Sequence, residues 1–322
     1  MSFVVTARAP GKIVLWGEFA VLAGAPAAVL AVDRYARCSI RATATQRWQL
    51  QSRGFVSSPT VASLDTILGG GNGVLSHALN ALPNDSLSDL PAGAACMLDT
   101  LCLYANGQKL GIGSSAAICT ATYTACAALV GVEPDFEAAR AAHRAFQGGK
   151  GSGIDLAAAW YGGALRFQAG SAEPLANFEP QAWTFFWTGK PAATTTHIGR
   201  FSEWVSQGNT RELDSLGDAC EALFQANHPD QLCAHLGEYV DRLRALDQAA
   251  HLGIYGEGHE HLHALAKEWE VVYKPCGAGG GDVGAATARD GETLAAFSAA
   301  AVDAGFQRLD VTRADHGAHL SR

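Results

Sequence analysis

The segment Lys109–Ala117 reads Lys-Leu-Gly-Ile-Gly-Ser-Ser-Ala-Ala and leads into an alanine-rich stretch that predicts a helix over Ser115–Val130. A helix leaves backbone N–H groups free at its N-terminus, and its dipole is positive there. Both would converge on the Gly-Ser-Ser turn, which predicts a phosphate site. The hydroxyls of Ser114 and Ser115 could also reach a magnesium ion.

Other interpretations of this segment remain open. Gly111, Gly113 and Ala116 also fit a dinucleotide-binding fingerprint, with Glu133 roughly twenty residues further on. Against that fingerprint, no strand separates Glu133 from the preceding helix, and Lys109 and the two serines are not needed. A helix cap without any ligand is a third interpretation. A Walker A loop is excluded, because no glycine-lysine-serine or glycine-lysine-threonine sequence follows the required glycine.

Two further glycine-rich segments accompany this one. The first is Ala9–Lys12, which leads to Gly17–Val21, and the other is Lys274–Gly284, with Gly279, Gly280 and Gly281 directly before Asp282. Consecutive glycines let the backbone adopt positive φ and approach a ligand closely. We expect the last segment to contact a ligand.

Composition sets the frame for these motifs. The chain has 322 residues, a net charge of -8 and 48% hydrophobic residues, enough for one large domain or two packed ones. Its acidity argues against nucleic acid as a partner. Neither a membrane span nor a signal peptide is expected. Eight cysteines without a CxxC pair predict reduced thiols and a cytoplasmic location.

Strand and helix patterns occur in separated runs, which indicates an α+β fold. The predicted strands are Phe3–Ala7, Ile13–Trp16, Ala27–Val32, Ala36–Ala42, Gly163–Phe167, Trp183–Trp187, Val271–Tyr273, Val283–Thr287 and Gln307–Val311. The predicted helices are Ser115–Val130, Asp135–Phe146, Ile154–Tyr161, Thr194–Ser206, Arg211–Gln225, Asp230–Ala250, His259–Glu270 and Glu292–Ala304. A loop over Gln168–Gln181 predicts domains 1–175 and 176–322.

The three glycine-rich segments, in this order and spacing, resemble the GHMP kinase superfamily over nearly the whole chain. The resemblance implies a two-domain fold, with an N-terminal domain like domain 2 of ribosomal protein S5 and a ferredoxin-like C-terminal domain. It implies an active site between the domains. ATP phosphates and Mg2+ would be held by the middle loop, comprising Gly111, Ile112, Gly113, Ser114, Ser115 and Ala116.

Within the superfamily, the chain resembles the phosphomevalonate kinases. Phe19 stands where mevalonate kinases typically carry histidine, and Asp282 where they carry a fourth glycine. Val283 and Cys276 depart from the family pattern. The resemblance implies a small phosphorylated acceptor, and a homodimer is compatible with it. The implied acceptor site comprises Glu18, Phe19, His143, Lys150, Ser152, Gly153, His197, Gly279, Gly280, Gly281 and Asp282.

Lys12, Lys109 and Asp155 are the predicted catalytic residues, because phosphoryl transfer depends on neutralising and positioning charge. Each lysine could instead be a solvated surface residue, and Asp155 could cap a helix. On an alcohol acceptor, Asp155 would be the base. A phosphate acceptor is mostly dianionic at pH 7 and needs no base, so Asp155 would then orient Lys12.

Several alternatives stay open. The rival functions are a kinase of an alcohol, such as a mevalonate kinase, and a non-catalytic nucleotide or metabolite sensor. Glu18 could organise the first loop or the metal region, or be buried against backbone, and Asp282 could bind the acceptor or shape its loop. His259 and His263 lie one helical turn apart, which allows a zinc site, although we expect an exposed helix start there.

Overall fold

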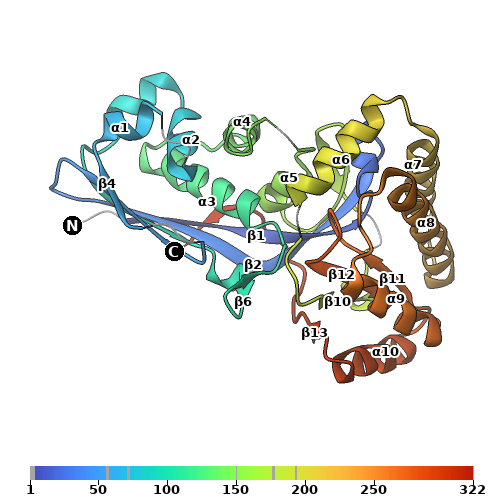
Figure 1. The fold of residues 1–322 in the computed structure, drawn as a ribbon. Helices are drawn as coiled ribbons and strands as arrows, with labels where there is room; N and C mark the ends of the chain where they lie inside the picture. Colours follow the sequence, from blue (N-terminus) through green and yellow to red (C-terminus); the bar gives the residue numbers. More distant parts are fainter. Residues whose placement is uncertain are drawn as a thin grey trace.

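The protein is described by a computed structural model over residues 4–55, 58–70, 73–149, 151–175, 178–192 and 194–321 (Figure 1). Its α+β class is confirmed. The larger sheet comprises β1 (Val4–Trp16), β2 (Ala27–Ala42), β3 (Trp48–Arg53), β4 (Thr60–Ala62), β5 (Ala94–Asp99), β8 (Ala164–Gln168), β9 (Ser171–Pro174) and β14 (His319–Leu320). The smaller sheet has the order β11 (Val272–Pro275), β12 (Val283–Thr287), β10 (Trp183–Trp187), β13 (Gln307–Arg308).

The helices are α1 (Leu64–Leu68), α2 (Val74–Asn80), α3 (Ser114–Leu129), α4 (Phe136–Phe146), α5 (Ile154–Tyr161), α6 (Thr194–Ser206), α7 (Arg211–Leu223), α8 (Pro229–Ala250), α9 (Glu257–Glu268) and α10 (Gly291–Asp303). A short hairpin of β6 (Tyr104–Ala105) and β7 (Gln108–Lys109) precedes α3.

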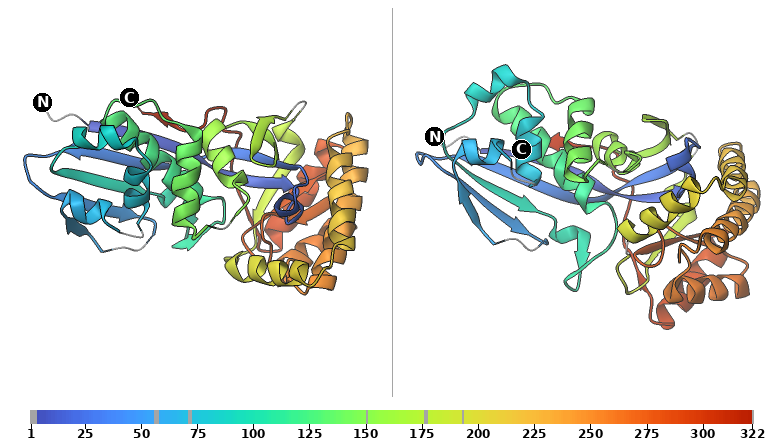
Figure 2. Two further views of the ribbon diagram at one scale, coloured as in Figure 1. Left: turned by 90° about the horizontal axis from the view of Figure 1, so that it is seen from above. Right: turned by 45° about the horizontal axis from the view of Figure 1, so that its top comes forward.

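A long antiparallel pair, β1 and β2, forms the spine of the molecule and runs from the end that holds both termini toward α7 and α8 (Figures 1 and 2). The sequence predicts four strands here, but the structure joins them into two. The register shifts between Pro10 and Gly11, so the segment between the predicted strands Phe3–Ala7 and Ile13–Trp16 is an irregularity inside β1 and does not interrupt the strand. Proline lacks an N–H to donate to the ladder, and such irregularities are where a sheet tolerates it.

Helix α3 packs directly on β1 and β2 and is buried along nearly its whole length. Ala117, Ala121 and Ala125 are fully buried, and their spacing of four residues puts them on one face of the helix. Small side chains let the helix approach the sheet closely while α2, α4 and α5 contact it from other sides. The candidate phosphate loop, Gly111–Ala116, which leads into α3, is therefore held against this pair of strands.

The smaller sheet is covered by helices that lie between its strands in the chain. Phe186 of β10 packs edge-on against Phe297 of α10 with ring centroids 5.6 Å apart, and Leu262 of α9 belongs to the same buried cluster. Helix α8 contacts both β11 and α7, and α7 reaches the turn Ala20–Ala23 that follows β1. The end of β1 thus meets the C-terminal half of the chain.

The segment Gln168–Gln181 contains a strand, so the prediction of a loop there is wrong for Ser171–Pro174. Gln168 pairs with Ser171 across a two-residue turn in which Ala169 and Gly170 both have positive φ. This is the geometry of a tight hairpin. Exposed polar residues and a proline give β9 little strand signal, because it lies at the edge of the sheet.

The last residues return to the larger sheet, so the predicted final strand Gln307–Val311 does not close the fold. Ala314 N–H donates to the Ala31 carbonyl at 2.9 Å, and His319 of β14 pairs with Arg8 of β1. The larger sheet thus contains β1–β5, β8 and β9 together with β14 of the C-terminal tail, and the smaller sheet contains β10–β13.

Gly317 locks the tail onto the end of α5, which leads to a testable expectation. An added Cβ would lie 1.9 Å from the Trp160 carbonyl oxygen. We expect Gly317→Ala to lower the free energy of unfolding by about 1–3 kcal/mol in urea titrations, the range for overpacking. Gly291→Ala is the matched control, because its Cβ would meet open space at the start of α10. Equal urea midpoints for the two variants would show that the tail can move away from the Trp160 carbonyl without loss of stability.

Candidate active site

The candidate phosphate loop leads directly into a helix. Helix α3 begins at Ser114, preceded by Gly113 with φ of +79° and without any side-chain cap. The serines therefore do not cap the helix. A Cβ on Gly113 would lie 2.8 Å from Lys12 Cγ, and Lys12 N–H donates to the Ile112 carbonyl at 2.8 Å. Strand β1 thus brings Lys12 directly against the loop.

The dinucleotide-fold interpretation is wrong. The strand before the loop is β7, which has two residues and pairs antiparallel with β6. A dinucleotide-binding unit would need a parallel strand-helix-strand arrangement. Lys109 is exposed at the end of β7 and is therefore free to face a ligand at the loop.

Lys12 and Asp155 form an ion pair, with 3.2 Å between Lys12 Nζ and Asp155 Oδ1. Their side chains are 10% and 34% exposed, so both reach the surface of the site. Helix α5 begins at Ile154 after Gly153, which has no side chain to cap it. The Asp155 carboxylate is thus directed at Lys12 rather than at the helix end, which removes the capping alternative.

A cavity of about 340 Å³ lies beside this pair. This is a size suited to a small ligand. Its lining brings together seven of the predicted site residues: Lys12, Glu18, Phe19, His143, Ser152, Gly153 and Asp155. The rest of the lining includes residues outside the predicted set, among them Gln147, Ile198, Gly277 and Ala278.

His143 is a polar residue in the lining of the cavity. It lies in the last turn of α4, is 4% exposed, and its Nε2 has no hydrogen-bond partner among the described residues. Burial lowers the pKa of His143, and the nearby Asp155 charge opposes that shift only in part. The ring is consequently neutral at pH 7 and can donate or accept one hydrogen bond from a ligand.

Phe19 forms an apolar wall of the cavity. It has φ of +60°, an uncommon conformation for a residue with a side chain, and is 5% exposed. Its ring lies 5.2 Å from that of Phe201 in α6, measured between centroids. The packing of α6 therefore supports this wall from behind.

The glycine-rich loop is held from several sides by backbone hydrogen bonds. Gly280 N–H donates to the Ile254 carbonyl at 2.7 Å, and His197 Nδ1 lies 2.9 Å from the Ala278 carbonyl. A Cβ on Gly280 would lie 2.4 Å from His197 Cε1. His197 and Gly279–Gly281 thus shape the loop and lie outside the described lining of the cavity.

Asp282 packs on the phosphate loop. A Cβ on Gly111 would lie 2.0 Å from Asp282 Cγ, and Asp282 Oδ1 accepts a hydrogen bond from Ala192 N–H at 2.9 Å. Burial raises the pKa of Asp282, whereas the Ala192 N–H and the charges of Lys12 and Lys109 act against that rise. Asp282 could bind the acceptor or shape the loop. The hydrogen bond to Ala192 N–H favours shaping of the loop, and Asp282 is not part of the described cavity lining.

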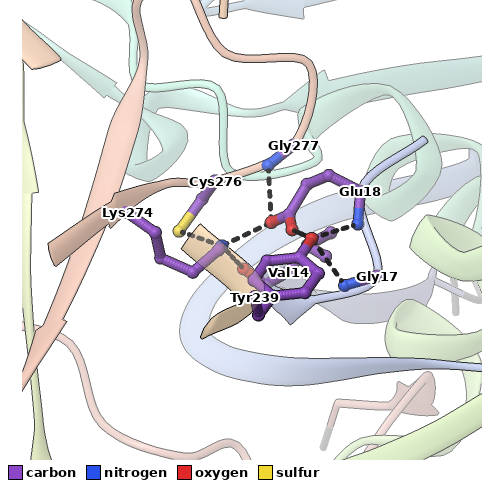
Figure 3. Close-up of polar contacts among 7 residues, drawn as sticks. All are labelled: Val14, Gly17, Glu18, Tyr239, Lys274, Cys276 and Gly277. Atoms are coloured by element: carbon purple, nitrogen blue, oxygen red, sulfur yellow. Dashed lines mark hydrogen bonds and ion pairs between the residues drawn. The ribbon is translucent and has the colours of Figure 1, made fainter. Parts of the chain in front are cut away.

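Glu18 is buried, and both of its carboxylate oxygens already have partners (Figure 3). Oε1 accepts from Lys274 Nζ at 2.5 Å and from Gly277 N–H at 3.3 Å, and Oε2 accepts from Tyr239 Oη at 2.5 Å. The carboxylate therefore has little capacity left for a metal ion. Sequence reasoning gave Lys274 low weight, although a lysine inside the apolar strand Val272–Pro275 is a signal for a buried partner.

Three sequence predictions remain, for Ser152, Lys150 and His259. Ser152 Oγ accepts from Ile154 N–H at 3.3 Å, which ties it to the start of α5. Lys150 lies outside the described residues. The exposed helix start predicted at His259 is wrong, since His259 is 1% exposed and bonds the Tyr273 hydroxyl and the Gly281 carbonyl, each at 2.8 Å.

His259 also explains why no zinc site is found there. Burial lowers the pKa of His259 to about 4, so the ring is neutral and both nitrogens are used by its two partners. Within the described ranges, no group of three or more histidine, cysteine or acidic residues could hold a metal ion. No helix in that part of the chain is long and apolar enough to cross a membrane.

The amino-acid sequence is similar to a known protein family and to several characterised enzymes. Residues 106–163 match the family model of the GHMP kinase N-terminal domain, which covers the phosphate loop and Asp155. A phosphomevalonate kinase of Streptomyces sp. (strain CL190) is 26% identical over 88% of this chain and 89% of its own. A mevalonate kinase of Pyrococcus horikoshii is 27% identical, with 86% of each chain covered.

The fold is shared with a solved Streptococcus pneumoniae phosphomevalonate kinase in complex with phosphomevalonate and AMPPNP. The TM-score is 0.77 at 18% identity, over 96% of this chain and 99% of that one. The family model, the relatives that span most of the chain and this common fold lead to one assignment. The chain carries a GHMP kinase N-terminal domain and, over most of its length, is most like the phosphomevalonate kinases, which are phosphotransferases.

Proposed function

We propose that this protein transfers the γ-phosphoryl group of ATP to 5-phosphomevalonate and so forms 5-diphosphomevalonate in the mevalonate isoprenoid pathway. The observation that carries the proposal is the Lys12–Asp155 ion pair, which stands between the phosphate loop and a cavity sized for a small acceptor. The relatives named phosphomevalonate kinase support the choice of acceptor. The free cysteines are compatible with a cytoplasmic location.

On the nucleotide side, Gly111–Ala116 would hold the phosphates with the free N–H groups at the start of α3, and Lys109 would add a positive charge. The hydroxyl oxygens of Ser114 and Ser115 suit Mg2+, which prefers oxygen ligands and is often bound mainly by phosphates and water. The absence of an acidic cluster from the described residues fits that mode. When bound, the ion would neutralise charge on the nucleotide phosphates.

On the acceptor side, a phosphate oxygen would form the new bond to the γ-phosphorus as the bond to ADP breaks. A dianionic acceptor needs no base. Lys12 would therefore neutralise charge on the transferred group, and Asp155 would hold the Lys12 ammonium in place. Phe19, His143, Ser152 and Gly153 would surround the acceptor.

An alcohol acceptor is the second candidate, because mevalonate kinases are also among the relatives. Asp155 would then accept the proton of the attacking hydroxyl. The sensor alternative is less favoured, since Lys12, Ser114 and Asp155 are all present in the sequence, Lys12 pairs with Asp155, and Lys12 lies against Gly113, the neighbour of Ser114.

Replacing Asp155 and Lys12 separately distinguishes these chemistries. With 5-phosphomevalonate, we expect Lys12→Met to lower kcat by about 100-fold or more, and Asp155→Asn by less than about 10-fold, in an ADP-release assay. Lys267→Met, at an exposed position on α9, is the control for loss of a lysine. Equal, near-total losses in both site variants would argue for base catalysis on a hydroxyl.

Asp282 tests the acceptor assignment. We expect wild-type turnover with 5-phosphomevalonate and not with mevalonate or homoserine, and we expect Asp282→Gly to lower kcat/KM for 5-phosphomevalonate by about 10-fold or more. Asp282→Asn keeps a side chain that tolerates the φ of +59° and can still accept a hydrogen bond from Ala192 N–H. This variant therefore distinguishes an effect of the carboxylate charge from an effect of the loop conformation. Turnover confined to mevalonate would overturn the proposed acceptor.

A further inference from the structure

We infer that Lys274 and Tyr239 are positioning residues for the acceptor, and that they act through Glu18 to fix two parts of the cavity wall. Only the identification of the cavity ligand as the acceptor rests on the proposed function. The three residues come from different parts of the fold: Glu18 follows β1, Tyr239 lies on α8 and Lys274 on β11 (Figure 3).

The first wall is fixed by the Tyr239 hydroxyl. This oxygen accepts from Gly17 N–H at 3.0 Å and from Glu18 N–H at 3.1 Å while it donates to Glu18 Oε2. Tyr239 is fully buried, so water cannot replace it at this position. The turn that presents Phe19 to the cavity is consequently tied to α8 by three hydrogen bonds to one atom.

The second wall is fixed by Lys274. Its Nζ donates to Glu18 Oε1 at 2.5 Å and to the Val14 carbonyl at 3.4 Å, and its side chain is fully buried. The same Oε1 accepts from Gly277 N–H. Gly277 and Ala278 line the cavity, as does Phe19. The Glu18 carboxylate thus joins the N-terminal wall to the glycine-rich wall.

The protonation states of Lys274 and Tyr239 are consistent with a fixed set of hydrogen bonds to Glu18. Burial alone would lower the pKa of Lys274, but Cys276, Glu18 and their hydrogen bonds raise it above its ordinary value, so Lys274 stays protonated. Burial and the Glu18 charge raise the pKa of Tyr239, which keeps its hydroxyl proton on the donor. A buried ion pair often adds little stability compared with apolar residues, whereas its geometry is highly directional.

If Lys274 had a purely structural role, its replacement would change Tm and leave the KM for the acceptor unchanged. A double variant distinguishes this role from positioning of the acceptor. Lys274→Met leaves Glu18 unpaired and is expected to lower Tm. The combined variant E18Q/K274M removes both charges and is expected to recover most of that Tm, because no unpaired buried charge remains. Its acceptor KM is expected to stay raised by about 10-fold or more, with ATP KM within about 2-fold of wild type.

Tyr239→Phe provides an independent arm, with an expected rise in acceptor KM and little change in ATP KM. Its matched control is Tyr123→Phe, since Tyr123 is equally buried and its hydroxyl accepts from Asp135 N–H on the far end of α4. Recovery of wild-type acceptor KM in E18Q/K274M, or equal effects of the two tyrosine variants, would overturn the inference.

Hydrogen exchange gives a readout that does not need turnover. We expect E18Q/K274M to lose amide protection at residues 17–19 and 276–278, with protection of α3 unchanged. Unchanged exchange at both walls would overturn the positioning role. Lack of wild-type turnover with 5-phosphomevalonate would instead defeat the proposed function, and the exchange result would still decide the inference.

Discussion

The buried Glu18–Lys274 ion pair is the contact on which the arrangement of the site depends. It joins residues 256 positions apart and connects the end of the spine strand β1 to β11 and the glycine-rich loop. Both side chains are at most 1% exposed, so in the folded arrangement solvent reaches neither charge and each depends on its protein partners. Because an unpaired buried charge is costly, the pair strongly favours one relative placement of the halves.

The phosphate loop shows the same convergence of both halves at a second point. Lys12 from β1 lies against Gly113, and Asp282 from the glycine-rich loop lies against Gly111. Neither approach leaves room for a Cβ, which explains why these two positions are glycine. The loop is thus formed by local sequence but held in place by two segments far from it in the chain.

This division between local and distant causes sets how far the sequence could predict the structure. The start of α3 and the pairing of Lys12 with Asp155 follow from motifs whose residues carry their own signals. Lys274, Tyr239 and His259 could not be ranked, because their importance depends on partners brought by tertiary packing. The joining of β1 across Pro10 and the edge strand β9 were missed because pairing overrode weak local propensity.

The charge balance of the cavity constrains how an anionic acceptor can bind. Lys12 is paired with Asp155, Glu18 with Lys274, and the buried His143 is neutral, so the described lining is close to electrically neutral. A dianionic acceptor would have to share Lys12 with Asp155 and take further hydrogen bonds from backbone N–H groups. Asp155 is the more exposed partner at 34%, so water can stabilise its charge when the Lys12 ammonium turns toward the ligand. The ion pair therefore holds Lys12 ready without preventing it from binding phosphate.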